Sequence, residues 1–140
     1  MDTVTFLTRL MMEDRVLMDM VDRRVLAELP RIDAPLDGPH KSVVGCTETG
    51  RLQESYFKSQ IRGHIRSEIN AHVMVVSGYG QNDAYCRSII GRLEQIFQDA
   101  QYIGAERIFI NSISSEVRTD SPPGKWVGSV KLSITKFDPV

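Results

Sequence analysis

The sequence predicts an α+β fold: a mixed, mostly antiparallel sheet with two main helices packed on it and a long C-terminal β-hairpin. From Ile61 to Val75, apolar and polar residues alternate, which predicts a long strand with one covered face. From Asp83 to Gln101, apolar residues recur at helical spacing. Between Glu106 and Phe137, two β-rich runs flank Ser121-Pro122-Pro123-Gly124, which predicts the hairpin.

We expect residues 1–140 to form a single domain, because 140 residues can bury one core without disulfides or metals. With 41% hydrophobic and 25% charged residues, the composition is that of a globular protein and excludes a disordered chain. The net charge of -1 shows no overall basic excess of the kind that nucleic-acid binders use.

The N-terminal segment is predicted to be helical. Thr3 is the expected N-cap, and the polar step Glu13-Asp14-Arg15 is expected to kink the helix or split it in two. We interpret the acidic residues of this segment as solvated charges with partners one helical turn away. Its methionines are better explained as gap-filling core than as a contact surface.

A loop and two strands are predicted next. Val25-Leu26 is a short extended piece, Pro30–Lys41 is a loop rich in turn residues, and Ser42–Thr47 is a strand. Thr49-Gly50 marks a turn or a bulge, and Leu52–Tyr56 fits either strand or loop.

The second main helix is expected to be capped by Asn82 or Asp83 and to end near Gly104. Its apolar stripe consists of Tyr85, Ile89, Leu93, Ile96, Phe97 and Ala100.

The first strand of the hairpin changes phase between Ile110 and Ile113, which predicts a bulge or a strong twist. The return strand should place one set of residues on each face. One face holds Trp126, Gly128, Val130, Leu132 and Ile134, and the other holds Lys125, Val127, Ser129, Lys131, Ser133 and Thr135.

No catalytic, metal or cofactor site is predicted. His64 and His72 lie on the same face of one strand but roughly 26 Å apart, and His40 stands in a loop without ligand spacing. Cys46 and Cys86 lack the spacing of a metal or redox motif and are interpreted as reduced, partly buried thiols.

Neither a signal peptide nor an apolar run of the ~20 residues that span a bilayer is present. We therefore expect a protein that is made in the cytoplasm and has no membrane partner.

The order of these parts resembles the tail-terminator, or tail-completion, proteins of tailed bacteriophages, including the lambda type. The resemblance covers nearly the whole chain. It runs from the helical start and Arg23-Arg24-Val25, through the strand His64–Tyr79 and the helix Asp83–Gln101, to the final segment Lys125–Thr135. The most specific part is this last strand, in which Trp126 opens an alternating segment. The polar stretch Leu52–Ile65 is longer than the family's usual connection and indicates an extended hairpin arm.

The resemblance implies a structural virion protein without enzymatic activity or cofactor. It implies a homo-oligomer, a hexameric ring at the head-proximal end of the tail tube, which ends tube polymerisation and joins the tail to the neck. The partners are then the tail tube protein and a neck or head-completion protein, and DNA is expected to pass through the ring without specific binding. Such a particle would be assembled in the host cytoplasm and end in the virion tail or neck.

The expected interface residues fall into two groups. The hairpin tip, residues 119–125, should reach a neighbouring subunit or ring, because it lies far from the predicted core. It consists of Thr119, Asp120, Ser121, Pro122, Pro123, Gly124 and Lys125. Arg62 and Arg66 form the second group. Together with Arg87 they would line a lumen if the chain bound nucleic acid, which is not expected to be its primary role.

Two alternatives remain open at this point. The first is another neck or head–tail connector protein, or a tail-tube protein, because these share much of the architecture. The second is a small cytosolic ligand-binding or enzyme domain that uses the turn Gly78-Tyr79-Gly80 with Cys86 or His72 nearby.

Overall fold

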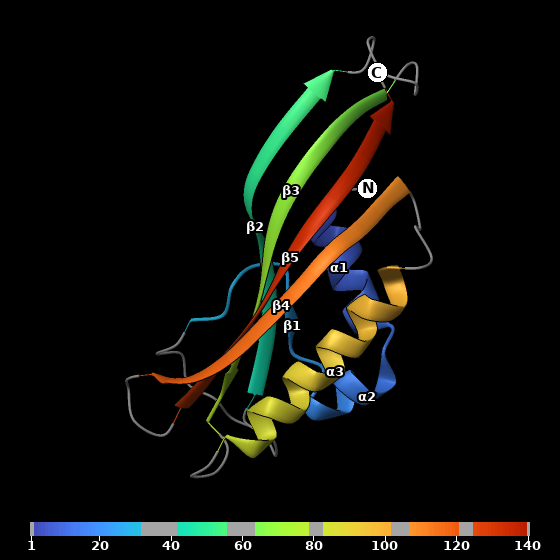
Figure 1. The fold of residues 1–140 in the computed structure, drawn as a ribbon. Helices are drawn as coiled ribbons and strands as arrows, with labels where there is room; N and C mark the ends of the chain where they lie inside the picture. Colours follow the sequence, from blue (N-terminus) through green and yellow to red (C-terminus); the bar gives the residue numbers. More distant parts are fainter. Residues whose placement is uncertain are drawn as a thin grey trace.

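The computed structural model describes residues 2–31, 42–55, 64–78, 83–101, 107–120 and 125–139. A five-stranded sheet in the order β1-β2-β3-β5-β4 carries its helices on one face (Figure 1), which confirms the predicted fold class. The elements are α1 Thr3–Met12, α2 Arg15–Met20, β1 Val25–Leu26, β2 Ser42–Ser55, β3 His64–Ser77, α3 Ala84–Gln101, β4 Ile108–Asp120 and β5 Lys125–Pro139.

The helical start is divided into two helices, each with an aspartate cap. Asp2, and not the predicted Thr3, caps α1: its carboxylate accepts a hydrogen bond from the Thr5 backbone N–H at 2.8 Å. Thr3 is instead buried in the first turn. Asp14 caps α2 by accepting from the Leu17 N–H at 2.8 Å, so the polar step splits the helix instead of kinking it.

The strands β2 and β3 form a long antiparallel pair, from Ser42↔Ser77 to Ser55↔Ile65. The register shifts between Glu48 and Gly50, so the predicted irregularity is a bulge and the strand continues beyond it to Ser55. The described part of the predicted arm is therefore strand.

The C-terminal hairpin pairs β4 with β5 from Ile108↔Lys136 to Asp120↔Lys125. Its register shifts between Ile110 and Ser112, which confirms the predicted phase change as a bulge at Asn111. The strand β5 then pairs with β3 along its whole length, and this places the hairpin next to the centre of the sheet. The short β1 pairs in parallel with β2.

The core lies between the helices and the sheet. The predicted α3 stripe packs there, with Tyr85 only partly buried, and so do Cys86 and Ile90, which the stripe did not include. Gly128 lies directly beneath α3, because a Cβ at this position would be 2.6 Å from Ile90 Cγ1. The apolar residues of α1, α2 and the strands complete this core, namely Phe6, Leu7, Met11, Leu17, Val44, Val73, Val75, Val130, Leu132 and Ile134.

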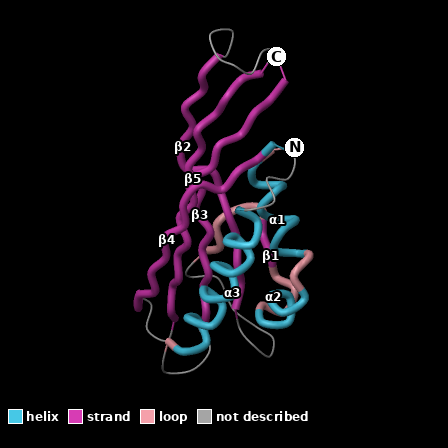
Figure 2. Tube along the Cα trace, turned by 45° about the vertical axis from the view of Figure 1, so that its right-hand side comes forward, coloured by secondary structure: helices cyan, strands magenta, loops and turns pink. Residues whose placement is uncertain are grey.

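Beyond the helix layer, β2, β3 and the end of β5 continue as an extension of the sheet (Figure 2). Several predictions lie outside the described residues: most of the Pro30–Lys41 loop, the Asn82 cap, the helix end at Gly104, and Ser121–Gly124 of the hairpin turn.

Candidate assembly surface

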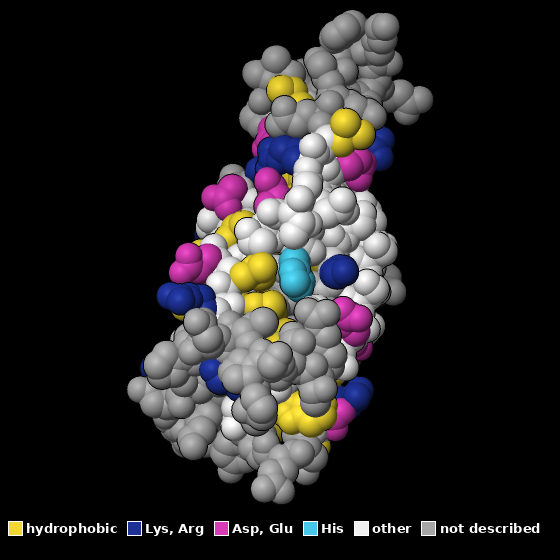
Figure 3. Space-filling view, turned by 90° about the vertical axis from the view of Figure 1, so that its left-hand side faces the viewer, with side chains coloured by type: hydrophobic (Ala, Val, Ile, Leu, Met, Phe, Trp, Pro, Cys, Tyr) yellow, Lys and Arg dark blue, Asp and Glu magenta, His cyan; other side chains and the backbone are white. Residues whose placement is uncertain are grey.

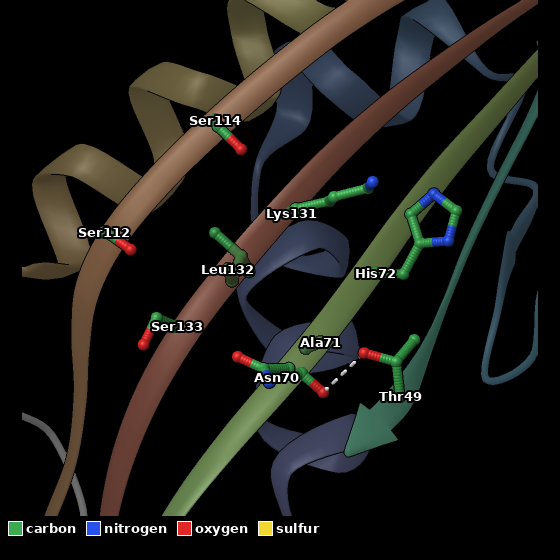
Figure 4. Close-up of a pocket in the computed structure, with 9 residues that line it drawn as sticks. All are labelled: Thr49, Asn70, Ala71, His72, Ser112, Ser114, Lys131, Leu132 and Ser133. Atoms are coloured by element: carbon green, nitrogen blue, oxygen red, sulfur yellow. Dashed lines mark hydrogen bonds between the residues drawn. The ribbon is translucent and has the colours of Figure 1, made fainter.

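The face of the sheet opposite the helices, here called the open face, is mainly polar (Figure 3). Strand alternation sends the small and polar side chains of β3, β4 and β5 to this side, because their apolar neighbours point to the helices. A shallow groove crosses these strands and reaches the bulge of β2 (Figure 4). Its lining consists of Thr49, Asn70, Ala71, His72, Ser112, Ser114, Lys131, Leu132 and Ser133.

Hydrogen bonds fix several of these side chains. The Thr49 hydroxyl donates to the carbonyl oxygen of Asn70 at 3.1 Å, which secures the bulge of β2 against β3. His72 Nε2 lies 3.0 Å from the Ser129 hydroxyl. Ser129 is only 5% exposed, so this serine–histidine pair lies largely within the packed surface of the sheet.

A second polar network crosses three strands nearer the arm. The bulge residue Asn111 of β4 donates from Nδ2 to the Thr135 hydroxyl of β5 at 2.7 Å. That hydroxyl donates in turn to the Glu68 carboxylate of β3, with oxygen–oxygen distances of 2.9 and 3.1 Å. Arg66 closes the network with an ion pair to Glu68 at 2.7 Å. The arm end of the sheet is thus tied together on its open face.

The opposite end of the open face is apolar and covered. Val43, Met74, Val76 and Val127 form a small second cluster there, and Leu26 and Leu29 pack on it. The chain after β1 passes so closely that a Cβ on Gly45 would lie 1.9 Å from the Glu28 carbonyl oxygen. Among the described residues, the middle and the arm end of the open face therefore remain polar and accessible.

The structure separates the two predicted groups of interface residues. The hairpin tip begins where β4 ends and β5 starts, with Asp120 opposite Lys125. Arg66 pairs with Phe137 near the far end of β5, about 40 Å away at the usual rise of a strand. Arg66 also forms an ion pair with Glu68, its neighbour two positions along the same face of β3. Arg62 and Ser121–Gly124 lie outside the described residues.

The cysteines and His72 form no common site. Both cysteines are free and buried, and burial raises the pKa of Cys86 to about 11 and also raises the pKa of Cys46. Cys86 faces the core from α3, whereas His72 lies on the open face, so the sheet stands between them. The described residues contain no cluster of three or more potential metal ligands. No helix among them is long and apolar enough to cross a membrane.

No protein-family model and no curated protein matches the sequence. The fold is similar to that of a chain in a solved virion of a native gene transfer agent (GTA) particle. The TM-score is 0.66 at 11% sequence identity, and the alignment covers 97% of this chain and 95% of that chain. The two chains therefore share one fold from end to end.

Proposed function

We propose that this chain is a structural protein of a phage-like virion, and specifically a tail terminator that forms a hexameric ring between tail tube and neck. The observation that carries the proposal is the structural similarity to a virion chain over nearly the full length of both chains. The alignment covers 97% of this chain and 95% of that chain. The resemblance to tail terminators in element order supports the narrower assignment.

The surfaces of the molecule suit such a role. The middle of the open face carries hydroxyl and amide groups with few charges. At its arm end, Arg66 is paired with a carboxylate. A surface of this kind can border passing DNA without holding it, because tight phosphate binding needs several unpaired cations. The net charge of -1 also allows many copies to pack closely.

The decisive experiment is the mass of the purified protein in solution, followed by electron microscopy. A closed ring with the mass of about six chains is the expected result. A monomer at all concentrations would refute the ring. Long tubes from the isolated chain would instead assign it to the tail-tube proteins. Particles assembled without the protein should have tails of irregular length that do not join heads.

The hairpin tip supplies a more local test of the assembly. Deleting Ser121–Gly124 removes the predicted turn but none of the paired residues of β4 and β5. We expect the fold to survive and the contact with a neighbouring subunit or ring to weaken. An unchanged oligomer that still joins tails to necks would remove the tip from the interface.

A further inference from the structure

The sheet has two edges that are free of strand partners over much of their length within the described residues. On one side, β1 pairs only with Val44 and Gly45, so β2 has no outer partner from Cys46 to Ser55. On the other side, β4 is the last strand of the sheet. A free edge presents unpaired N–H and C=O groups and is a template for another strand.

The two edges carry exposed apolar side chains at the same level. Leu52 of β2 is opposite Glu68, Glu68 is opposite Thr135, and Thr135 is opposite Phe109 of β4. Leu52 and Phe109 therefore share one row across the sheet, and both point to the open face because residues opposite one another share a face. They are 62% and 38% exposed, so both large apolar side chains are accessible to a neighbouring chain.

We propose that β4 of one copy of this chain pairs antiparallel with β2 of a second copy, with Phe109 of the first beside Leu52 of the second. The directions of the strands fit, because β2 and β4 run in opposite directions within the sheet. When two copies are related by a rotation about an axis parallel to the strands, the strand directions and the height of each row along that axis are unchanged. Such a rotation can bring Leu52 of one copy next to Phe109 of the other and join their sheets.

The chemistry of the edges favours a second copy as the occupant. The strand β4 has no charged or proline residue from Ile108 to Ser115, although such residues normally block edge pairing. On β2, Glu48 and Arg51 form an ion pair at 2.8 Å, and Glu54 is the one other charged residue of this strand. The rings of Phe109 and Phe137 pack edge-to-face with their centroids 6.0 Å apart, and together they form an apolar surface that Leu52 of the second copy can contact.

The two edges differ, so the contact is heterologous and can repeat around a closed ring. The inference rests on the proposed ring and adds which strands form it. A two-fold dimer, in which β4 meets β4, is the arrangement that it excludes.

Disulfide trapping between two single variants tests the pairing. Leu52→Cys and Phe109→Cys are purified with different tags, mixed under reducing conditions, and then oxidised. Within one chain the two positions are about 14 Å apart, across three strand spacings, which is too far for a disulfide. A cross-link that needs both variants is the expected result. Val16→Cys, on the exposed surface of α2, replaces Leu52→Cys as the matched control and should give none.

The outcomes separate this inference from the proposed function. Rings that form without the mixed cross-link, or with cross-links within either variant alone, would overturn the β2–β4 pairing and leave the ring intact. Chains that stay monomeric would overturn both.

A second measurement does not depend on a disulfide. Leu52→Asp places a charge against the apolar surface of Phe109 and Phe137, and we expect association measured by sedimentation to be at least about tenfold weaker. The thermal unfolding midpoint of the isolated chain should not change. Val16→Asp should leave association unchanged. Equal association of Leu52→Asp and the wild type would overturn the pairing.

Discussion

Arg92 of α3 donates two hydrogen bonds to Asp14, the residue that caps α2, with nitrogen–oxygen distances of 3.0 and 2.5 Å. The two residues are 78 positions apart, so this pair links the helical start to the central helix. Asp14 thus has two functions: it satisfies the first turn of α2, and it holds α2 against α3.

Two substitutions separate these functions. Asn is as good an N-cap as Asp, so Asp14→Asn should keep the cap and lose only the ionic part of the contact. Asp14→Ala loses both, and we expect it to be less stable than Asp14→Asn by about 1 kcal/mol in urea unfolding. Equal stabilities of the two variants would show that the cap contributes nothing.

The same pair predicts acid sensitivity. The hydrogen bonds from Arg92 hold the pKa of the Asp14 carboxyl below its ordinary value of 3.8. Because this pKa is lower in the folded than in the unfolded chain, its contribution to stability is present above about pH 4 and is lost as the pH falls through the folded-state pKa. The Thr5 N–H and hydroxyl lower the pKa of Asp2 in the same way.

Urea unfolding at a series of pH values between about 2 and 6 measures this effect. The wild type should lose more stability towards acid than Asp14→Asn, which has no carboxyl to protonate at this position. Parallel curves for the two proteins would contradict the assignment to Asp14.

The close approach of α3 to β5 depends on Gly128. An added Cβ would lie 2.6 and 2.7 Å from two carbons of Ile90 and 3.2 Å from Cys86 Sγ. We expect Gly128→Ala to lower the free energy of unfolding by about 1–3 kcal/mol, because the packed helix must shift. In a double-mutant cycle, Ile90→Ala should relieve this clash. The double variant should therefore lose less stability than the sum of the losses of the two single variants. Strict additivity would mean that Ile90 is not what Gly128 accommodates.

Much of this architecture follows from local patterns in the sequence. The alternation in β3 and β5 predicts which residues face the helices, because a strand with one covered face must separate its apolar and polar side chains. The α3 stripe is predicted in the same way, but it omits Ile90 and Cys86. Both lie at helical spacing from Leu93 and Phe97, so the same pattern could have included them. What the helix pattern does not reveal is how closely α3 approaches Gly128.

The long-range polar contacts of the surface could not be predicted. The acidic residues of the helical start were expected to pair within one helical turn, yet Asp14 pairs with Arg92. The hydrogen bond between Thr135 and Glu68, which are 67 positions apart, is likewise not indicated by any local pattern. Leu52 and Phe109 lie in the same row of the sheet because of where the bulges shift the register of β2 and β4. The sequence locates these bulges only approximately.

Both thiols should be unreactive in the native protein. The thiolate is the reactive species, and burial raises the pKa of Cys86 to about 11 and raises that of Cys46 as well. At pH 8 we expect alkylation by iodoacetamide to be at least about a hundredfold slower than for the urea-unfolded chain, in which both cysteines should react. Rapid native labelling at either position, located by mass spectrometry, would show that the core opens there.

The network of Asn111, Thr135 and Glu68 should stabilise the arm end of the sheet. Thr135→Val keeps the size of the side chain but removes the hydroxyl that joins three strands, which leaves Asn111 and Glu68 with fewer partners. We expect a loss of about 1–2 kcal/mol in urea unfolding.

Ser133→Ala is the matched control for this change, because Ser133 is on the same strand and face but outside the network. It should cost less than Thr135→Val. The loss should also be local, with faster amide exchange near Glu68 and Asn111 than near the covered end at Val76. If Thr135→Val and Ser133→Ala are equally stable and exchange alike, the network only positions the side chains. The open face near Phe109 would then be held by strand pairing alone.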